Sequence, residues 1–333
     1  MLDNISILIT GGTGSFGRQF VKTALRQYKP KKLIVYSRDE LKQFEMQQKW
    51  PEGDVLRYFL GDVRDYHRLK MSMRGIDIVI HAAALKHVPV AEYNPFEVIK
   101  TNVYGSQNVI DASMDEEVDL CLAVSSDKAV SPLNLYGSTK LAMEKLFIAA
   151  NNLKGKRKTK FSCVRYGNVL GSRGSVVPKF IEQIQSQNKI TITNKNMTRF
   201  NITLDDALGL ILHAIKFSKG NEVFVPKLKS YILSDLIDTL KEISSIPFSQ
   251  KNIPLRPGEK MHELLLNEYE IKYSIESNGV YILLPSNYVN MGQIRKMYPN
   301  SKSLGLQVYS SDNVSHISKN DLKKILIKHK FKI

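Results

Sequence analysis

Short apolar runs alternate with longer amphipathic stretches through the first half of the chain. The runs have the length and composition of buried strands, and they lie at 6–10, 33–37, 55–60, 76–81, 120–126 and 161–166. The stretches between them, such as 18–28, 66–73, 97–111 and 136–151, have the period of helices. This alternation predicts a doubly wound parallel α/β sheet.

The alternation breaks up in the second half. We expect a strand at 190–193, a loop at 197–200 that carries one functional arginine, a helix at 205–218, a strand at 222–226 and a helix at 234–244. Residues 1–172 are therefore expected to form the parallel-sheet domain, with 205–226 returning to it. Residues 173–333 are expected to form mainly a smaller C-terminal substrate-binding domain that contributes loops to a shared cleft.

A glycine-rich turn joins the first predicted strand to the first predicted helix. Gly12, Gly14 and Gly17 fit G-x-G-x-x-G, and Gly11 gives the looser G-x-x-G-x-x-G. Glycines at this turn let the backbone approach a pyrophosphate at the helix N-terminus, where free N–H groups favour negative charge. The turn therefore predicts a Rossmann-type dinucleotide site formed by Gly11, Thr13, Gly14, Ser15, Phe16 and Gly17.

Charged residues follow the second predicted strand, where such sheets meet the cofactor ribose. Ser37, Arg38 and Asp39 stand at this end, and Lys42 follows one turn later. An arginine here can hold a 2′-phosphate, which favours NADP. Asp39 leaves NAD open, because an acid could still accept a hydrogen bond from a free ribose hydroxyl.

The next two strand ends add further cofactor candidates. Asp62, beside Val63, could bond an adenine amine or cap the helix at 66–73, and both could hold. The small residues Ala82, Ala83 and Ala84 permit close approach of a cofactor ribose or phosphate, and Lys86 is a candidate contact for cofactor or substrate.

The chemistry of the chain is concentrated at 125–140. Asp127 and Lys128 follow the fifth predicted strand, at the carboxyl end where open α/β sheets place their ligand crevice. Tyr136 and Lys140 are four residues apart and share one helix face, so the lysine could lower the pKa of the phenol and produce a tyrosinate base. The alternative is chance, because a tyrosine and a lysine occur at this spacing in many helices.

Composition narrows the possible partners. Apolar residues make up 43% and charged residues 24%, as in ordinary globular proteins. The net charge of +16 could attract nucleic acid, a membrane surface or an anionic small molecule. Its basic runs are more typical of solvated faces and no DNA-binding signature accompanies them, so we expect neither a nucleic-acid nor a membrane partner.

Targeting signals, metal sites and redox sites are not expected either. The chain enters an apolar strand within a few residues of Met1 and contains no apolar run of membrane-spanning length, which favours a cytoplasmic location. Cys121 and Cys163 lie in apolar runs rather than at metal or redox spacings, so we expect both to be buried and reduced and expect no metal.

With these residues in place, the chain resembles the extended short-chain dehydrogenases/reductases, and most closely their inverting UDP-N-acetylglucosamine 4,6-dehydratases of pseudaminic acid biosynthesis. The resemblance rests on the glycine turn, the Tyr136-x-x-x-Lys140 pair, and the segments 36–42, 85–95, 165–169, 171–178 and 256–260. It covers most of residues 5–205 and recurs at 256–263. The chain departs from the family at Asn201, where tryptophan is usual, and at Ser126, where threonine is common.

The resemblance implies tightly held NADP+ that is regenerated in each turnover, with Val169 added to its pocket. It implies that Tyr136 and Lys140 also contact the cofactor, with Lys140 bonding its ribose. It implies that Tyr136 removes the C4 hydroxyl proton during hydride transfer, that Lys128 is the base at C5 and that Asp127 is the acid for the C6 hydroxyl. Lys128 would be neutral if cationic neighbours or desolvation lowered its pKa. The remaining expected substrate contacts are Lys86, Lys100, Thr101, Asn168, Arg173, Val177, Arg199, Arg256 and Glu259.

Three alternatives stay open at this stage. A UDP-sugar C4 epimerase or a retaining 4,6-dehydratase would use the same scaffold, and a non-catalytic Rossmann protein that senses NADP or binds RNA is more remote. The Asp127-Lys128 pair favours the inverting dehydratase, because retaining enzymes carry Asp-Glu at this place. The resemblance also implies a homo-oligomer, and a role in pseudaminic-acid-type or related surface glycan synthesis.

Overall fold

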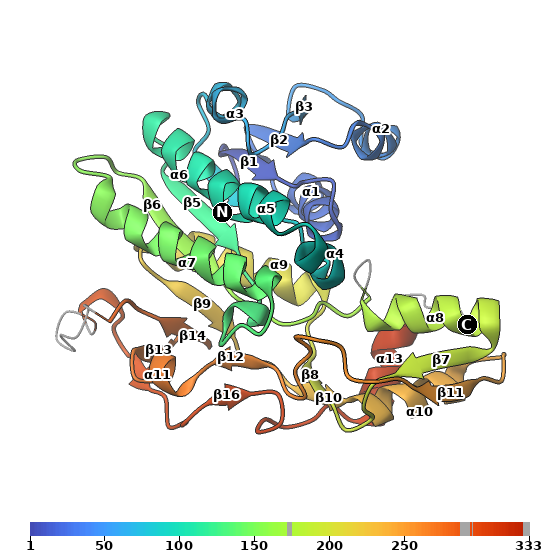
Figure 1. The fold of residues 1–333 in the computed structure, drawn as a ribbon. Coiled ribbons are helices and arrows are strands. Elements are labelled where there is room, and N and C mark those ends of the chain that lie inside the picture. Colours follow the sequence, from blue (N-terminus) through green and yellow to red (C-terminus); the bar gives the residue numbers. More distant parts are fainter. Residues whose placement is uncertain (172–174, 287–293, 295, 329–333) are drawn as a thin grey trace.

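A ten-stranded mixed sheet runs through the computed structural model, which describes residues 1–171, 175–286, 294 and 296–328 (Figure 1). Its strand order is β15-β13-β14-β9-β6-β5-β4-β1-β2-β3. The seven strands from β3 to β9 in this order are parallel to one another, which confirms the predicted fold class. They are β1 (Ser6–Thr10), β2 (Lys32–Ser37), β3 (Leu56–Leu60), β4 (Ile78–His81), β5 (Leu120–Val124), β6 (Lys160–Val164) and β9 (Val223–Pro226).

Helices cover both faces of these parallel strands, as the apolar character of both strand faces requires. On one face, α3 (Tyr66–Ser72), α6 (Gly105–Asp115) and α7 (Leu135–Leu153) pack side by side over one apolar core. On the other face, α1 (Ser15–Gln27) and α9 (Leu204–Phe217) pack against each other over a second core (Figure 1). Helix α2 (Glu40–Lys49) adds Met46 to this second core. The free cysteines Cys121 and Cys163 are buried in the first core, as predicted.

The predicted helix at 97–111 is divided into three pieces. The pieces are α5 (Pro95–Ile99), a π-helical turn, η1 (Lys100–Tyr104), and α6. Helix α4 (Val88–Tyr93) precedes them. Within η1, the Asn102 side chain accepts from Leu85 N at 2.8 Å and donates to Leu85 O at 2.9 Å. The widened turn thus ties the chain after β4 to the helix layer, a contact that periodicity does not reveal.

Antiparallel strands extend the sheet beyond the predicted elements. They are β14 (Val280–Leu283), β13 (Ser274–Ser277) and β15 (Lys302–Ser303), and β14 pairs with β9. Much of the chain after residue 270 therefore lies against the parallel sheet.

A third apolar core lies outside the parallel sheet, among elements from the second half of the chain. Its side chains come from α8 (Val176–Gln187), β7 (Lys189–Ile192), α10 (Leu233–Ile243) and α13 (Lys319–Lys328). The remaining elements of this region are β8 (Thr198–Phe200), β10 (Ser230–Ile232), β11 (Ser249–Asn252), β12 (Leu264–Leu266), α11 (Glu268–Ile271) and β16 (Tyr309–Ser310). The expectation of a loop at 197–200 is wrong, because β8 pairs antiparallel with β10. The division into two domains at residue 172 stays a prediction.

No helix in the described part of the chain combines the length and the apolar character needed to cross a membrane.

Candidate active site

The glycine turn after β1 has the close packing that a dinucleotide cradle requires. Gly11 has φ +66°, and a side chain there would come within 2.8 Å of the Ala83 backbone. A side chain at Gly17 would come within 2.2 Å of the Gly12 carbonyl oxygen, so this glycine lets α1 approach the turn. Gly14 caps α1 without a side chain, which leaves the first-turn amides of Ser15 and Phe16 facing outward from the helix end. These residues fit a pyrophosphate at the helix N-terminus.

The residues after β2 have a clear division of roles. Asp39 accepts from Lys42 N at 3.0 Å as the N-cap of α2, and its carboxylate is also paired with the Lys42 ammonium. Ser37 Oγ lies 2.9 Å from Thr13 Oγ1, which joins this strand end to the glycine turn. Arg38 is half-exposed. Asp39 is thus engaged as a helix cap and ion-pair partner, and the two cations beside it are both partly exposed.

Asp62 follows β3 and is held by two arginines. Its carboxylate accepts from Arg64 at 2.8 Å and from Arg38 at 3.2 Å. Burial opposes the charged form, but Arg64 and Arg38 outweigh it and lower the pKa of Asp62. The expectation that Asp62 caps the following helix is wrong, because Asp65 accepts from Arg68 N at 2.9 Å and is the N-cap of α3. Its predicted contact with adenine stays a prediction.

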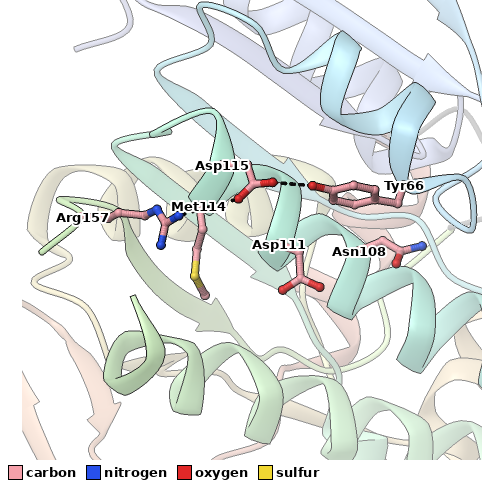
Figure 2. Close-up of a pocket in the computed structure, with 6 residues that line it drawn as sticks. All are labelled: Tyr66, Asn108, Asp111, Met114, Asp115 and Arg157. Atoms are coloured by element: carbon pink, nitrogen blue, oxygen red, sulfur yellow. Dashed lines mark hydrogen bonds and ion pairs between the residues drawn. The ribbon is translucent and has the colours of Figure 1, made fainter. Parts of the chain in front are cut away.

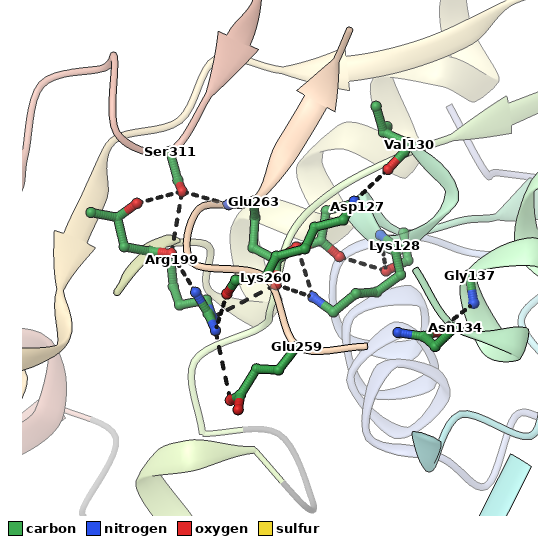
Figure 3. Close-up of polar contacts among 12 residues, drawn as sticks. Asp127, Lys128, Val130, Asn134, Gly137, Arg199, Glu259, Lys260, Glu263 and Ser311 are labelled. Atoms are coloured by element: carbon green, nitrogen blue, oxygen red, sulfur yellow. Dashed lines mark hydrogen bonds and ion pairs between the residues drawn. The ribbon is translucent and has the colours of Figure 1, made fainter. Parts of the chain in front are cut away.

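Asp127 and Lys128 stand at the carboxyl end of the sheet, in the short helical turn η2 (Asp127–Ala129) after β5. The Lys128 ammonium donates to Asp127 Oδ2 at 3.2 Å, and the Ser126 hydroxyl donates to Asp127 Oδ1 at 2.7 Å (Figure 3). Asp127 is only 1% exposed. Burial raises the pKa of its carboxyl, against the opposing effect of the Lys128 ammonium. Asp127 is therefore suited to carry a proton.

Lys128 has acidic neighbours where the sequence predicts cationic ones. Its ammonium donates to Glu263 Oε1 at 2.7 Å in addition to Asp127. Burial opposes the charge of Lys128, but the two carboxylates outweigh it and raise the pKa of the ammonium. Desolvation thus acts on Lys128 in the predicted direction, but the net shift of its pKa is opposite to the one that a neutral lysine needs.

Tyr136 and Lys140 lie in the first turns of α7, one turn apart as predicted. The Lys140 ammonium donates to Val124 O at 2.8 Å, at the end of β5, and burial lowers its pKa to about 8. Burial and the Asp127 carboxylate raise the pKa of Tyr136 to about 12, although the Ser126 hydroxyl and Lys128 oppose this rise. The expected lowering of the Tyr136 pKa by Lys140 is not found.

The segment 256–263 closes over these residues from the C-terminal half. Lys260 Nζ donates to Val130 O at 2.5 Å (Figure 3). Asn134 Nδ2 donates to Gly258 O at 3.0 Å. Glu263, at the end of the segment, is 2% exposed and touches Lys128. Sequence reasoning missed Glu263 and Ser126 as site residues. Their signals were present, because Ser126 adjoins Asp127 and Glu263 closes the second stretch of family resemblance.

Arg199 on β8 holds this segment in place. Its NH1 donates to Thr198 O at 2.7 Å and Met261 O at 3.0 Å, and its NH2 donates to Lys260 O at 3.0 Å. Its Nε lies 3.7 Å from Glu263 Oε1, and its NH2 lies 3.9 Å from Glu259 Oε1. The terminal nitrogens of Arg199 are thus occupied by the protein, and its predicted contact with a diphosphate stays a prediction.

The other predicted substrate contacts are dispersed. Val177 is fully buried in the third core, so its side chain packs against the protein. Thr101 is buried and bonds to Glu97 O at 3.0 Å, and Lys100 donates to the Glu97 carboxylate at 2.8 Å. Lys86, Asn168 and Arg256 are exposed, Val169 and Glu259 are half-buried, and Arg173 lies outside the described residues.

A separate surface pocket of about 440 Å³ lies beside α3 and α6 (Figure 2). Asp115 in its wall accepts from Lys70 at 2.8 Å and from Tyr66, and it lies 3.8 Å from Arg157. None of the predicted site residues lines this pocket, so it is distinct from the cluster around Lys128.

A parallel sheet with a glycine turn after β1 and a tyrosine-lysine pair on the helix after β5 defines a short-chain dehydrogenase/reductase. The model of the polysaccharide biosynthesis protein family matches residues 7–285, and the chain belongs to that family. A relative from Campylobacter jejuni, named UDP-N-acetylglucosamine 4,6-dehydratase (inverting), is 50% identical over 86% of this chain and 84% of its own. A relative from Rickettsia akari, named UDP-glucose 4-epimerase, is 36% identical over 97% of this chain and 95% of its own.

Solved structures share the fold. Pen from Bacillus thuringiensis superposes with a TM-score of 0.91 at 38% identity, over 99% of both chains. DesIV from Streptomyces venezuelae, a dTDP-glucose 4,6-dehydratase solved with NAD and TYD bound, has a TM-score of 0.69 at 19% identity, over 77% of this chain and 87% of its own. At that identity the likeness shows the fold, in which the neighbour holds a nicotinamide dinucleotide.

Proposed function

We propose that the protein dehydrates UDP-N-acetylglucosamine to a UDP-4-keto-6-deoxy-L-arabino-hexosamine, with inversion at C5. One observation carries the proposal. Buried Asp127 and half-buried Lys128 lie at the carboxyl end of β5 beside Tyr136 and Lys140, in a chain 50% identical to an inverting dehydratase of this substrate. This pair adds acid-base groups to the Tyr-Lys machinery of hydride transfer.

The chemistry begins at C4 of the sugar. Tyr136 accepts the C4 hydroxyl proton, and the Lys128 ammonium and the Ser126 hydroxyl are the groups in the site that favour its phenolate form. A nicotinamide dinucleotide held by the glycine turn would supply the hydride acceptor for C4 and the hydride donor for C6. Lys140 orients the site at the end of β5 through its bond to Val124 O.

The elimination then uses the pair after β5. The 4-ketone acidifies the C5–H bond, and Lys128 takes the C5 proton. Asp127, whose pKa burial raises, gives a proton to the departing C6 hydroxyl, which leaves as water. Return of a proton to C5 on the opposite face inverts that centre and completes the 4-keto-6-deoxy product.

The cofactor we propose is NADP+, held tightly and regenerated in each turnover. Asp39 is engaged as a helix cap and an ion-pair partner of Lys42, and this supports cations rather than an acid at the ribose end. Arg38 and Lys42 would hold the 2′-phosphate, with Ser37 beside them, and Ala82, Ala83 and Ala84 would face the dinucleotide across Gly11.

On the substrate side, we propose that exposed Arg256 meets the UDP diphosphate. We also propose a homo-oligomer in the cytoplasm that feeds a pseudaminic-acid-type or related surface glycan. Membership of a polysaccharide biosynthesis family supports this destination.

A UDP-sugar C4 epimerase is the second candidate, because a relative of that name matches nearly the whole chain. Epimerisation changes only C4 and needs no acid-base pair for C5 and C6. The buried pair after β5 therefore favours dehydration, and loss of water from the product separates the two.

The proposal is tested by incubating the purified protein with UDP-N-acetylglucosamine in deuterated water, without added cofactor, and following the sugar by proton NMR. We expect a 4-keto-6-deoxy sugar with deuterium at C5 and L-arabino couplings, and NADP+ released on denaturation of the protein. A D-xylo product would contradict inversion, a C4 epimer would support the second candidate, and released NAD+ would contradict the proposed cofactor.

A further inference from the structure

Glu263 is a buried carboxylate that contacts Lys128, although it comes 135 positions later in the sequence. Its Oε1 accepts from Lys128 Nζ at 2.7 Å and lies 3.7 Å from Arg199 Nε (Figure 3). Its backbone N donates to Ser311 Oγ at 2.8 Å, just before β12. The carboxylate is thus fixed at the ammonium of the proposed C5 base.

The second oxygen of Glu263 is unpaired. Within the ranges that the structure describes, Oε2 is buried and has no hydrogen-bond partner. Leaving a buried polar atom unpaired costs about 1–3 kcal/mol. A carboxylate kept in this state beside a reactive lysine therefore requires an explanation, and one explanation is chemistry.

Lys128 must lose a proton before it can act as a base, and Glu263 is the neighbour that can accept that proton. A lysine takes a proton from carbon only as a neutral amine, yet the Glu263 carboxylate favours the ammonium form of Lys128. Asp127 cannot receive the surplus proton, because it must carry a proton for the C6 hydroxyl. Asp127 Oδ2 is also the more distant acceptor, at 3.2 Å against 2.7 Å for Glu263 Oε1.

We propose that Glu263 is the proton acceptor of Lys128, an inference that rests on the proposed function. One proton moves along the 2.7 Å hydrogen bond from Lys128 Nζ to Glu263 Oε1. An N–H bond breaks as an O–H bond forms, and the ion pair becomes a neutral amine and a carboxylic acid. After rotation about its Cε–Nζ bond, the amine takes the C5 proton. Glu263 is a positioning residue in this scheme, because it acts through Lys128.

Substrate binding provides the driving force. A sugar seated over Lys128 expels water, and a desolvated ion pair is costly relative to its neutral form. Other ionisable groups face the pair from every side: Asp127 on η2, Tyr136 on α7, Arg199 on β8, Tyr231 on β10, and Glu259 and Lys260 on the closing segment. After the C5 proton has moved to Lys128 and the Asp127 proton to the C6 hydroxyl, Lys128 passes one proton to the Asp127 carboxylate and takes the Glu263 proton in its place. Arg199 and Lys260 favour the Glu263 carboxylate and so favour this return to the resting state.

The test is the Glu263→Gln variant, whose amide oxygen still accepts from Lys128 but cannot take its proton. We expect the rate of dehydration near neutral pH to fall about a hundredfold. Incorporation of deuterium at C5 should fall equally, while oxidation at C4 continues, so that absorbance of the reduced cofactor builds up. A defect confined to C5 distinguishes proton transfer from a general loss of structure.

The pH profile is the second readout. In Glu263→Gln, the amine forms only by loss of a proton to solvent, so the rate should rise about tenfold per pH unit below the lysine pKa. The wild type should have a flat profile over the same range. Glu263→Asp keeps a carboxylate and should restore the flat profile and about a tenth of the rate. Glu276→Gln, which removes the partner of Lys227 at the surface, should behave as wild type.

Several results would overturn the inference: a Glu263→Gln rate equal to wild type, a loss that is the same at every pH, or an equal loss of C4 oxidation. If Glu263→Gln does not fold, a sloped profile in Glu263→Asp would overturn it. A wild type that does not dehydrate the sugar at all refutes the proposed function itself, which is a separate outcome read without any variant.

Discussion

Two buried ionic clusters lie at the carboxyl ends of the neighbouring strands β5 and β6, and they differ in how completely their atoms are paired. After β6, the Arg165 guanidinium donates to Glu144 at 2.6 and 2.9 Å, to Glu270 at 2.8 and 2.9 Å, and to Leu265 O at 2.9 Å. All five N–H groups of this guanidinium are therefore used. After β5, Lys128 has two carboxylate partners, and Glu263 keeps an unpaired oxygen.

Each cluster connects the end of a parallel strand to a segment that lies far away in the sequence. Arg165 joins β6 and α7 to α11, and Lys128 joins the turn after β5 to the residue before β12. A cluster without a spare donor or acceptor can only hold elements together, whereas one with a spare oxygen and a third ammonium hydrogen can bind and exchange protons. Pairing, rather than charge or burial, thus separates the structural cluster from the reactive one.

The largest effect should come from breaking the paired cluster. Arg165→Met leaves Glu144 and Glu270 buried without a cation, so the free energy of unfolding should fall by about 5 kcal/mol. Chemical denaturation measures this loss. Replacing the two glutamates by glutamine in the same variant should recover much of the stability, and an Arg165→Met variant as stable as wild type would contradict the structural role.

The next largest effect is expected at Tyr136, beside the reactive cluster around Lys128. Tyr136→Phe removes one hydroxyl beside Asp127 and leaves the ring in place, so the rate of C4 oxidation should fall about a thousandfold. Reduction of the bound cofactor after mixing with substrate measures this step. The unfolding free energy should stay within about 1 kcal/mol of wild type. Near-normal cofactor reduction would remove Tyr136 from its proposed role.

Lys140 gives a pH-dependent effect. Its folded pKa is about 8 and its ordinary value is 10.5, so between these pH values the unfolded chain binds the proton and the folded chain does not. Stability therefore rises with pH through this window, relative to a Lys140→Met variant, by up to about 3 kcal/mol. Urea unfolding of both proteins without added cofactor measures the difference, and a difference that does not change between these pH values would contradict the pKa.

The smallest effect on the free energy of unfolding is expected for an ion pair at the surface. Glu276 pairs with Lys227 at the surface, where both side chains are more than a third exposed. Glu276→Gln should change the unfolding free energy by less than about 1 kcal/mol, because solvent screens the pair. A loss as large as that of Arg165→Met would mean that burial does not govern these clusters.

The sequence predicts the parallel sheet well, because each strand is a compact apolar run between helical stretches. It does not predict β13, β14 and β15, whose positions depend on pairing with β9 rather than on local pattern. The strand β8 was mistaken for a loop because it is short and carries the polar residues Thr198 and Arg199.

The site is predictable up to the point where distant segments meet. The proximity of Asp127, Lys128, Tyr136 and Lys140 is predictable because they lie close together in the sequence, and their roles stay predictions. The neighbours of Lys128 are not predictable in this way, since Glu263 comes 135 positions later and reverses the sign of the charge around the lysine. The protonation of a buried group thus depends on contacts that local sequence does not contain.

The closing segment 256–263 is translated later than the glycine turn and the first strands of the parallel sheet. The glycine turn and β1 to β6 are translated first and can assemble while the rest of the chain is still being made. Glu263 and its Ser311 anchor leave the ribosome after all of these elements. The residues of the proposed dinucleotide cradle are therefore made before the acidic partner of Lys128, so the reactive cluster is completed after the cradle.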